Sequence, residues 1–229
     1  MTSPIILALD TPDIHVAQSW IRATNDVIKV YKAGLEFFLA HGTSGISALR
    51  QAGDFELFLD LKLHDIPNTV ASAAKSIAAI NPRFLTVHAS GGKEMVKAAA
   101  QAVPLIDITA VTILTSLSEE SLHEIGFSHS SLESAVKLAS LSVEAGARAI
   151  VSSPLEVAAI RDAVGPQPII ITPGVRPIGS ALGDQKRVMT PRDAIQAGST
   201  FLVIGRPITS LGDPASMLKA AREITDSLF

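Results

Sequence analysis

The sequence has no cysteine, and among its 229 residues it has one tryptophan and one tyrosine. Without cysteine there is no disulfide framework, no thiolate metal site and no cysteine nucleophile. No apolar run approaches the roughly 18–20 residues that cross a bilayer, and the segment from Met1 to Asp10 has no basic start. We therefore expect a cytoplasmic protein with neither signal peptide nor membrane anchor.

Charge is also sparse, since charged residues make up 18% of the chain and the formal net charge is -3. Such a charge gives no overall attraction to nucleic acid or to anionic membranes, so any phosphate binding has to be local. Hydrophobic residues make up 47%, which is typical of a globular α/β protein. We expect a small-molecule substrate and no nucleic-acid or membrane partner.

Apolar, β-branched runs of strand length alternate along the chain with alanine-rich amphipathic segments. This alternation predicts parallel βαβ units, and eight short units favour a closed (β/α)8 TIM barrel over a doubly wound open sheet. No linker divides the chain, so residues 1–229 are expected to form one catalytic domain. The predicted strands are Ile5–Leu9, Val27–Tyr31, Leu57–Leu61, Phe84–His88, Ile108–Leu114, Ala149–Ser152, Pro168–Thr172 and Phe201–Ile204. The predicted helices are Asp13–Thr24, Gly45–Ala52, Thr69–Ile80, Lys93–Ala102, Leu132–Ala145, Pro154–Val164, Pro191–Ala197 and Pro214–Leu228.

The third predicted strand runs into a cluster of charges at Asp60, Lys62 and Asp65. If the strand is regular, Asp60 and Lys62 project from one face, roughly 6.5–7 Å apart at Cα. A charge in a buried strand costs several kcal/mol unless it is paired. The three groups are therefore predicted to pair with one another or to face a site.

The residues that end the strands of a barrel surround one opening, where the active sites of such barrels lie. Asp10 and Lys32 follow the first two predicted strands. Together they suit a sugar, because a carboxylate accepts from hydroxyls and an ammonium donates to them. His88 ends the fourth strand, and we interpret it as a structural histidine rather than a general base.

The last predicted strand leads into Gly205 and Arg206, where a close backbone approach and a forked cation suit a phosphate group. The alternative is an ordinary glycine turn with an exposed arginine. The connection from Pro173 to Thr190 is long for a barrel loop and carries Arg176 and Gln185. It is either a lid that closes over an anion or a tolerated insertion.

No group of histidines has the spacing of metal ligands, and no Walker or dinucleotide fingerprint is present. Asp60 and Asp65 are conceivable ligands, but Lys62 between them already supplies a cation and lowers the need for Mg²⁺. We expect no metal and no nucleotide cofactor of these kinds.

The stretch from Asp60 to Thr69 reads D-x-K-x-x-D-I-P-x-T and resembles the signature of the orotidine 5'-phosphate decarboxylase family. The resemblance covers nearly the whole chain. It implies a TIM barrel that converts orotidine 5'-phosphate to UMP and CO2 without a cofactor, in the last step of de novo pyrimidine biosynthesis. Further matching segments are Leu7–Asp10, Tyr31–Gly34, Val87–Gly92, Val111–Ser116, Thr172–Arg176 and Val203–Ile208.

Roles for individual residues follow from the same resemblance. It implies that Lys62 protonates the ring carbon that loses CO2, within a charge network with Asp60, Asp65 and Lys32. It also implies a homodimer in which the two subunits share active sites. The residues that reach the neighbouring site would be Asp65, Ile66 and Thr69. The remaining substrate contacts would be Asp10 and Lys32 to the ribose, Thr115 beside Ser116 to the pyrimidine, and Arg176, Gln185, Gly205 and Arg206 to the phosphate.

Two alternatives stay open. A sister group resembling 3-keto-gulonate 6-phosphate decarboxylase and hexulose phosphate synthase shares the D-x-K-x-x-D core but works through Mg²⁺. Its second strand typically supplies a glutamate ligand where this chain has Lys32, and the continuation through Pro67 and Thr69 favours the pyrimidine enzyme. The other alternative is a non-catalytic sensor of a UMP-type ligand, which would not need the Lys62 ammonium between carboxylates.

Overall fold

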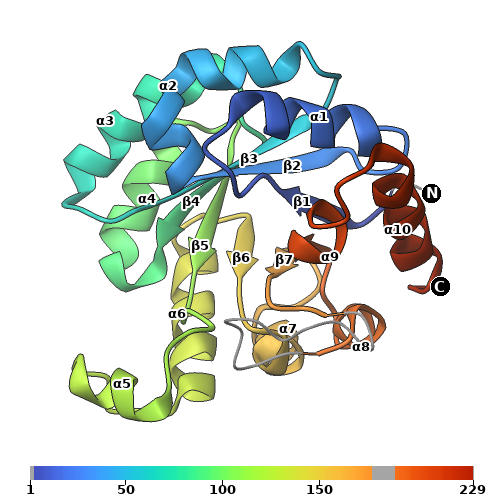
Figure 1. Cartoon of the computed structure of the whole chain (residues 1–229). Helices are drawn as coiled ribbons and strands as arrows, with labels where there is room; N and C mark the ends of the chain where they lie inside the picture. The colour runs from blue at the N-terminus through green and yellow to red at the C-terminus, as the bar shows by residue number, and fades with distance from the viewer. Residues whose placement is uncertain (1–2, 177–188, 229) are drawn as a thin grey trace.

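The computed structural model describes residues 3–176 and 189–228, and its eight strands form a closed parallel barrel (Figure 1). Each strand pairs in parallel with the next, and the eighth pairs with the first. The predicted TIM barrel is confirmed, and the open sheet is wrong. The strands are β1 Ile5–Ala8, β2 Val30–Gly34, β3 Glu56–Leu63, β4 Phe84–His88, β5 Asp107–Val111, β6 Ala149–Val151, β7 Ile169–Thr172 and β8 Phe201–Ile204.

Helices surround the barrel as an outer ring (Figure 1). Within the described part of the chain, no helix combines the length and the apolar character needed to cross a membrane. The helices are α1 Ile14–Thr24, α2 Leu35–Arg50, α3 Pro67–Ile77, α4 Lys93–Ala102, α5 Glu119–Glu124, α6 Ser131–Glu144, α7 Val157–Val164, α8 Pro191–Gln196, α9 Arg206–Thr209 and α10 Pro214–Asp226. Short 3-10 turns are η1 Ala78–Ile80, η2 Ala89–Gly91 and η3 Pro154–Glu156.

Helix α2 begins at Leu35, well before the predicted start at Gly45. Gly42 interrupts its helical backbone with a φ of 58°, a conformation that glycine adopts without steric cost. The chain therefore turns at Gly42 and resumes the helix, so the predicted start at Gly45 falls in the part of α2 after the turn. Helix α5 was not predicted, because its six residues are too few to show a helical period.

Strand β2 lies further along the chain than the predicted Val27–Tyr31. The amide groups of Val27 and Ile28 both donate to the carbonyl of Thr24, at 2.9 Å, so these residues continue the turn that ends α1. The sheet begins only at Val30. As a result, Lys32 lies inside a strand instead of after it.

The barrel interior below the opening is filled by side chains from alternate strand positions, including Ile6, Phe58, Phe84 and Ile171. Phe84 contacts Phe58 and Phe201 edge-on, with ring centroids 5.7 and 5.9 Å away. At the amino-terminal end, the guanidinium of Arg83 lies 4.7 Å from the Phe84 ring. This packing fills the lower barrel and leaves the carboxyl ends of the strands for a site.

Candidate active site

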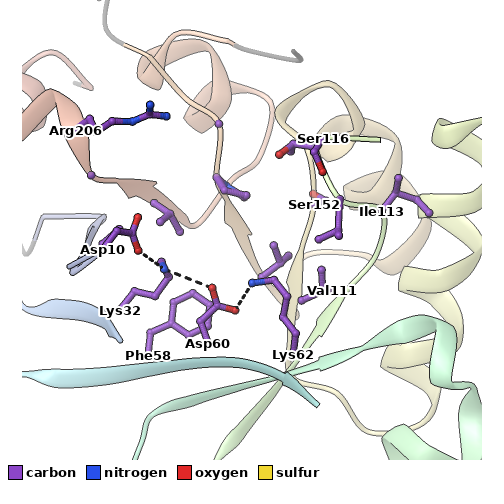
Figure 2. A pocket seen from close by; sticks show the side chains of 18 of the residues that line it. Asp10, Lys32, Phe58, Asp60, Lys62, Val111, Ile113, Ser116, Ser152 and Arg206 are labelled. Atoms are coloured by element: carbon purple, nitrogen blue, oxygen red, sulfur yellow. Dashed lines mark hydrogen bonds and ion pairs between the residues drawn. The ribbon is translucent and has the colours of Figure 1, made fainter. Parts of the chain in front are cut away.

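A cavity of about 340 Å³ lies at the carboxyl ends of the strands. This volume is within the range of small-molecule sites, roughly 300–1,000 Å³. Its walls come from β1, β2, β3, β5, β6 and β8 and from the segments that follow β1, β5, β6, β7 and β8 (Figure 2). The sequence-predicted residues that line it are Asp10, Lys32, Asp60, Lys62, Thr115, Arg176, Gly205 and Arg206.

Four charged side chains of alternating sign form a row along one wall of the cavity (Figure 2). Lys32 Nζ lies 3.0 Å from Asp10 Oδ1 and 3.6 Å from Asp60 Oδ2. Lys62 Nζ lies 2.8 Å from Asp60 Oδ1. We call Asp10, Lys32, Asp60 and Lys62 the charge row. Each carboxylate oxygen of Asp60 therefore lies next to one ammonium group.

The Lys62 position depends on an irregularity in β3. Leu59 pairs with Leu85 and Leu63 pairs with Val87, so the strand bulges between these two pairs. Lys62 has a φ of 49°, in the left-handed region that residues other than glycine rarely adopt. The regular strand assumed in the sequence prediction is therefore wrong at this point, and the bulge brings the ammonium of Lys62 against Asp60.

In the charge row, burial and the nearby opposite charges shift the pKa values of Asp60 and Lys32 in opposite directions. Burial alone would raise the pKa of Asp60, but the ammonium groups of Lys32 and Lys62 and the hydrogen bonds from Lys62 and Thr86 hold that pKa below its ordinary value. Burial alone would lower the pKa of Lys32, yet the carboxylates of Asp60 and Asp10 raise it. Opposite charge thus outweighs burial for both Asp60 and Lys32 and favours their charged forms.

The lowered pKa of Asp60 predicts how stability depends on pH. Its carboxylate contributes stability above the unfolded-state pKa of about 3.9, and this contribution is lost as the pH falls through the lower folded-state pKa. Relative to Asp60→Asn, the wild type should therefore lose free energy of unfolding as the pH falls below about 4. Urea unfolding of both proteins between pH 6 and 3 measures this difference. A constant difference across that range would contradict the lowered pKa.

Gly205 directly follows β8 and lies beside Asp10. A Cβ atom on Gly205 would lie 3.4 Å from the Cβ of Ala8 and 3.8 Å from Asp10 Oδ2. Arg206 follows directly and lies on the side of the cavity above Asp10 (Figure 2). The absence of a side chain at Gly205 therefore keeps space open between the charge row and a guanidinium.

Arg176 reaches the cavity from the segment after β7. Its backbone amide donates to the carbonyl of Met189 at 3.0 Å, and one guanidinium nitrogen donates to the carbonyl of Val175 at 2.8 Å. These contacts tie Arg176 to both ends of the connection after β7. Gln185, predicted as a further phosphate contact, lies outside the described residues, as does most of the predicted lid.

The wall across from Arg206 carries hydroxyl groups and apolar side chains. Ser116 and Ser152 lie there in Figure 2, and Thr115 also lines the cavity. The lining also includes the apolar side chains Phe58, Val111, Ile113, Val151 and Val203. The cavity thus combines a cationic end, a charged wall and apolar side chains, which suits a ligand with an anionic group and a flat polar ring.

Three predicted site residues do not line this cavity. Asp65, Ile66 and Thr69 are exposed at the start of α3, and Ile66 is 66% exposed. One oxygen of Asp65 accepts from the amide of Ile66 at 2.6 Å. The predicted network of Asp60, Lys62 and Asp65 is therefore not assembled by these residues within one chain.

Two residues of the site, Phe58 and Thr86, were not predicted from the sequence. Phe58 could have been found, because it lies two residues before Asp60 and shares its face of β3. Thr86 could not, because nothing in its sequence context distinguishes it from a strand residue that only packs. Its hydroxyl accepts from the amide of Lys62 at 2.8 Å and donates to Asp60 Oδ1 at 3.0 Å.

His88, which the sequence predicts to be structural, lies near the charge row. Its ring centroid is 5.4 Å from that of His64. Burial, then the positive charges of His64 and Lys62, lower the pKa of His88. Across residues 3–176 and 189–228, no three histidine, aspartate or glutamate side chains gather in a way that could hold a metal ion.

Comparison with known proteins gives concordant matches. Residues 3–221 match the family described as "Orotidine 5'-phosphate decarboxylase / HUMPS family". A protein of Thermobifida fusca named orotidine 5'-phosphate decarboxylase is 51% identical over 96% of this chain and 94% of its own length. A protein of the same name from Anaeromyxobacter sp. is 49% identical over 94% and 95%. The crystal structure of orotidine 5'-phosphate decarboxylase from Lactobacillus acidophilus superposes with a TM-score of 0.84 at 34% identity, covering 98% and 99% of the two chains.

Proposed function

Because this chain belongs to the orotidine 5'-phosphate decarboxylase / HUMPS family, we propose that it converts orotidine 5'-phosphate to UMP and CO2. This reaction is the last step of de novo UMP biosynthesis. The observation that carries the proposal is the charge row, in which the Lys62 ammonium lies 2.8 Å from Asp60 at the wall of a ligand-sized cavity. No cofactor takes part in the proposed reaction.

The chemistry requires a fixed cation. When CO2 leaves the pyrimidine ring, the electron pair stays on a ring carbon in the plane of the ring and cannot spread into the π system. A nearby ammonium stabilises that charge and then donates the proton that completes UMP. We assign both roles to Lys62. Asp60 orients the ammonium from one side, and Lys32 supports Asp60 from the other.

The remaining cavity residues bind the parts of the substrate that do not react. Asp10 and Lys32 hold the ribose hydroxyls, and Thr115 with Ser116 contacts the edge of the pyrimidine. Arg176, Gly205 and Arg206 bind the phosphate, and we include Gln185 in this group from the sequence. Phosphate binding is remote from the bond that breaks, so its binding energy serves to position the ring against Lys62.

We further propose a homodimer with shared active sites. Asp65, Ile66 and Thr69 are exposed and outside their own chain's cavity, which leaves them available to the cavity of a second copy. In that arrangement Asp65 of the partner subunit joins the charge row beside Lys62. Residues 1–229 act as one cytoplasmic catalytic domain, without a nucleic-acid or membrane partner.

An absorbance assay tests the proposed function. The purified protein is mixed with orotidine 5'-phosphate, and loss of its ultraviolet absorbance is followed with and without EDTA. We expect turnover that EDTA does not change, because Lys62 supplies the charge that a metal would otherwise provide. Mg²⁺-dependent turnover of a sugar phosphate would identify the sister activity instead. Tight UMP binding without turnover would identify a sensor.

A further inference from the structure

Thr86 lies in β4 and does not line the cavity, yet its hydroxyl contacts both Lys62 and Asp60. We propose that Thr86 is a positioning residue, and that its hydroxyl fixes Lys62 and Asp60 relative to each other. This inference rests on the proposed function, because the arrangement that it fixes is the one assigned to proton donation.

The bulge in β3 creates the need for such a group. Four residue steps from Leu59 to Leu63 lie opposite two steps from Leu85 to Val87. Ladder pairing is therefore interrupted at the position where Lys62 adopts a φ of 49°. A lysine in the left-handed region persists only where its surroundings hold it. The Lys62 amide, which has left the ladder, donates to the Thr86 hydroxyl at 2.8 Å.

The same hydroxyl then closes a ring of hydrogen bonds. Because its oxygen accepts from the Lys62 amide, its single proton is available to Asp60 Oδ1 at 3.0 Å. That carboxylate oxygen also accepts from Lys62 Nζ at 2.8 Å. The ring runs from the Lys62 backbone through Thr86 and Asp60 to the Lys62 ammonium. It ties the reacting nitrogen of Lys62 to its own main chain.

Burial strengthens these hydrogen bonds by keeping water away from them. The relative exposure of Thr86 is 0% and that of Asp60 is 9%, so water competes little for either group. Removal of the hydroxyl leaves the Lys62 amide without this acceptor and Asp60 without one donor. Both groups then shift to find partners, and a displacement of about 1 Å at a reacting group costs about 10²-fold in rate.

Thr109 offers a matched control. It is the register partner of Thr86 on β5, it is equally buried, and its hydroxyl donates to the carbonyl of Asp107 at 2.9 Å. It does not line the cavity, and no hydrogen bond links its hydroxyl to Asp60 or Lys62 among the described residues. Replacement by valine removes one buried hydroxyl from the barrel at either position. Only Thr86→Val removes the contact to Asp60 and Lys62.

The kinetic test compares Thr86→Val, Thr86→Ser and Thr109→Val by kcat and KM for orotidine 5'-phosphate. We expect Thr86→Val to lose about 10²-fold in kcat with KM changed by less than about 3-fold. Thr86→Ser keeps the hydroxyl and should stay within about 3-fold of wild type, as should Thr109→Val. Equal losses in both valine variants, or a Thr86→Ser variant as slow as Thr86→Val, would overturn the positioning role.

Amide hydrogen exchange at Lys62, followed by NMR, measures the hydrogen bond from the Lys62 amide to Thr86 independently of turnover. We expect exchange at this amide to become at least about 10-fold faster in Thr86→Val, and to stay unchanged in Thr86→Ser and Thr109→Val. A wild type without decarboxylase activity but with this exchange pattern would refute the proposed function and support the hydrogen-bond ring. An active wild type with neither the kcat loss nor the exchange change in Thr86→Val would refute the inference alone.

Discussion

The Lys62→Ala variant is expected to lose at least about 10⁴-fold in kcat/KM for orotidine 5'-phosphate. The Lys62 side chain contributes to the reaction rate in two ways. Stabilisation of developing charge by one preorganised donor is worth about 10²–10³-fold, and a positioned proton donor about 10²–10⁴-fold. The measurement is the ultraviolet assay at high enzyme concentration, with EDTA present.

Two comparisons make this result specific to Lys62. The exposed Lys219, which pairs with Glu223 on α10, does not line the cavity, so Lys219→Ala should keep wild-type activity. UMP affinity should change much less than activity in Lys62→Ala, because the ribose and phosphate contacts remain. A Lys62→Ala protein that retains more than about 1% of wild-type kcat would contradict the assigned proton donor.

Mixed dimers of Lys62→Ala and Asp65→Ala subunits are expected to recover about one quarter of the wild-type activity, although each variant alone is nearly inactive. If active sites are shared, one site of the mixed dimer carries both substitutions and the other carries neither. Random exchange puts about half of all subunits in mixed dimers, and half of their sites are intact.

The experiment mixes the purified variants under conditions that exchange subunits and follows turnover with time. Turnover should rise as mixed dimers form, and size-exclusion chromatography coupled to light scattering should give the mass of a dimer. A mixture of Lys62→Ala with Lys62→Ala/Asp65→Ala is the control, because every site then lacks Lys62 and no activity should return. If the first mixture also stays inactive, the shared-site arrangement is wrong.

Strand positions were predictable where the chain shows a clear period, and least so where local contacts compete with the sheet. The β-branched run at Val27 and Ile28 indicates a strand, but both amides bond to Thr24 at the end of α1. The predicted helix begins only at Gly45, but helical structure already starts at Leu35 and is interrupted at Gly42 by a φ of 58°. In each case a backbone hydrogen bond or a single φ angle decides the outcome, and neither leaves a periodic signal in the sequence.

The barrel, and the location of a charged site at its opening, were predictable from the sequence. Eight alternating strand and helix segments specify the fold, and the charges that follow Leu59 are too costly to bury unless they pair or serve a site. The way in which Lys62 meets Asp60 was not predictable from the sequence. A strand sequence specifies which faces its residues share, but the bulge in β3 arises from its register against β4. The acceptor for the displaced amide of Lys62 is Thr86, twenty-four positions further along the chain. Because that contact joins two strands, it exists only once the sheet has formed.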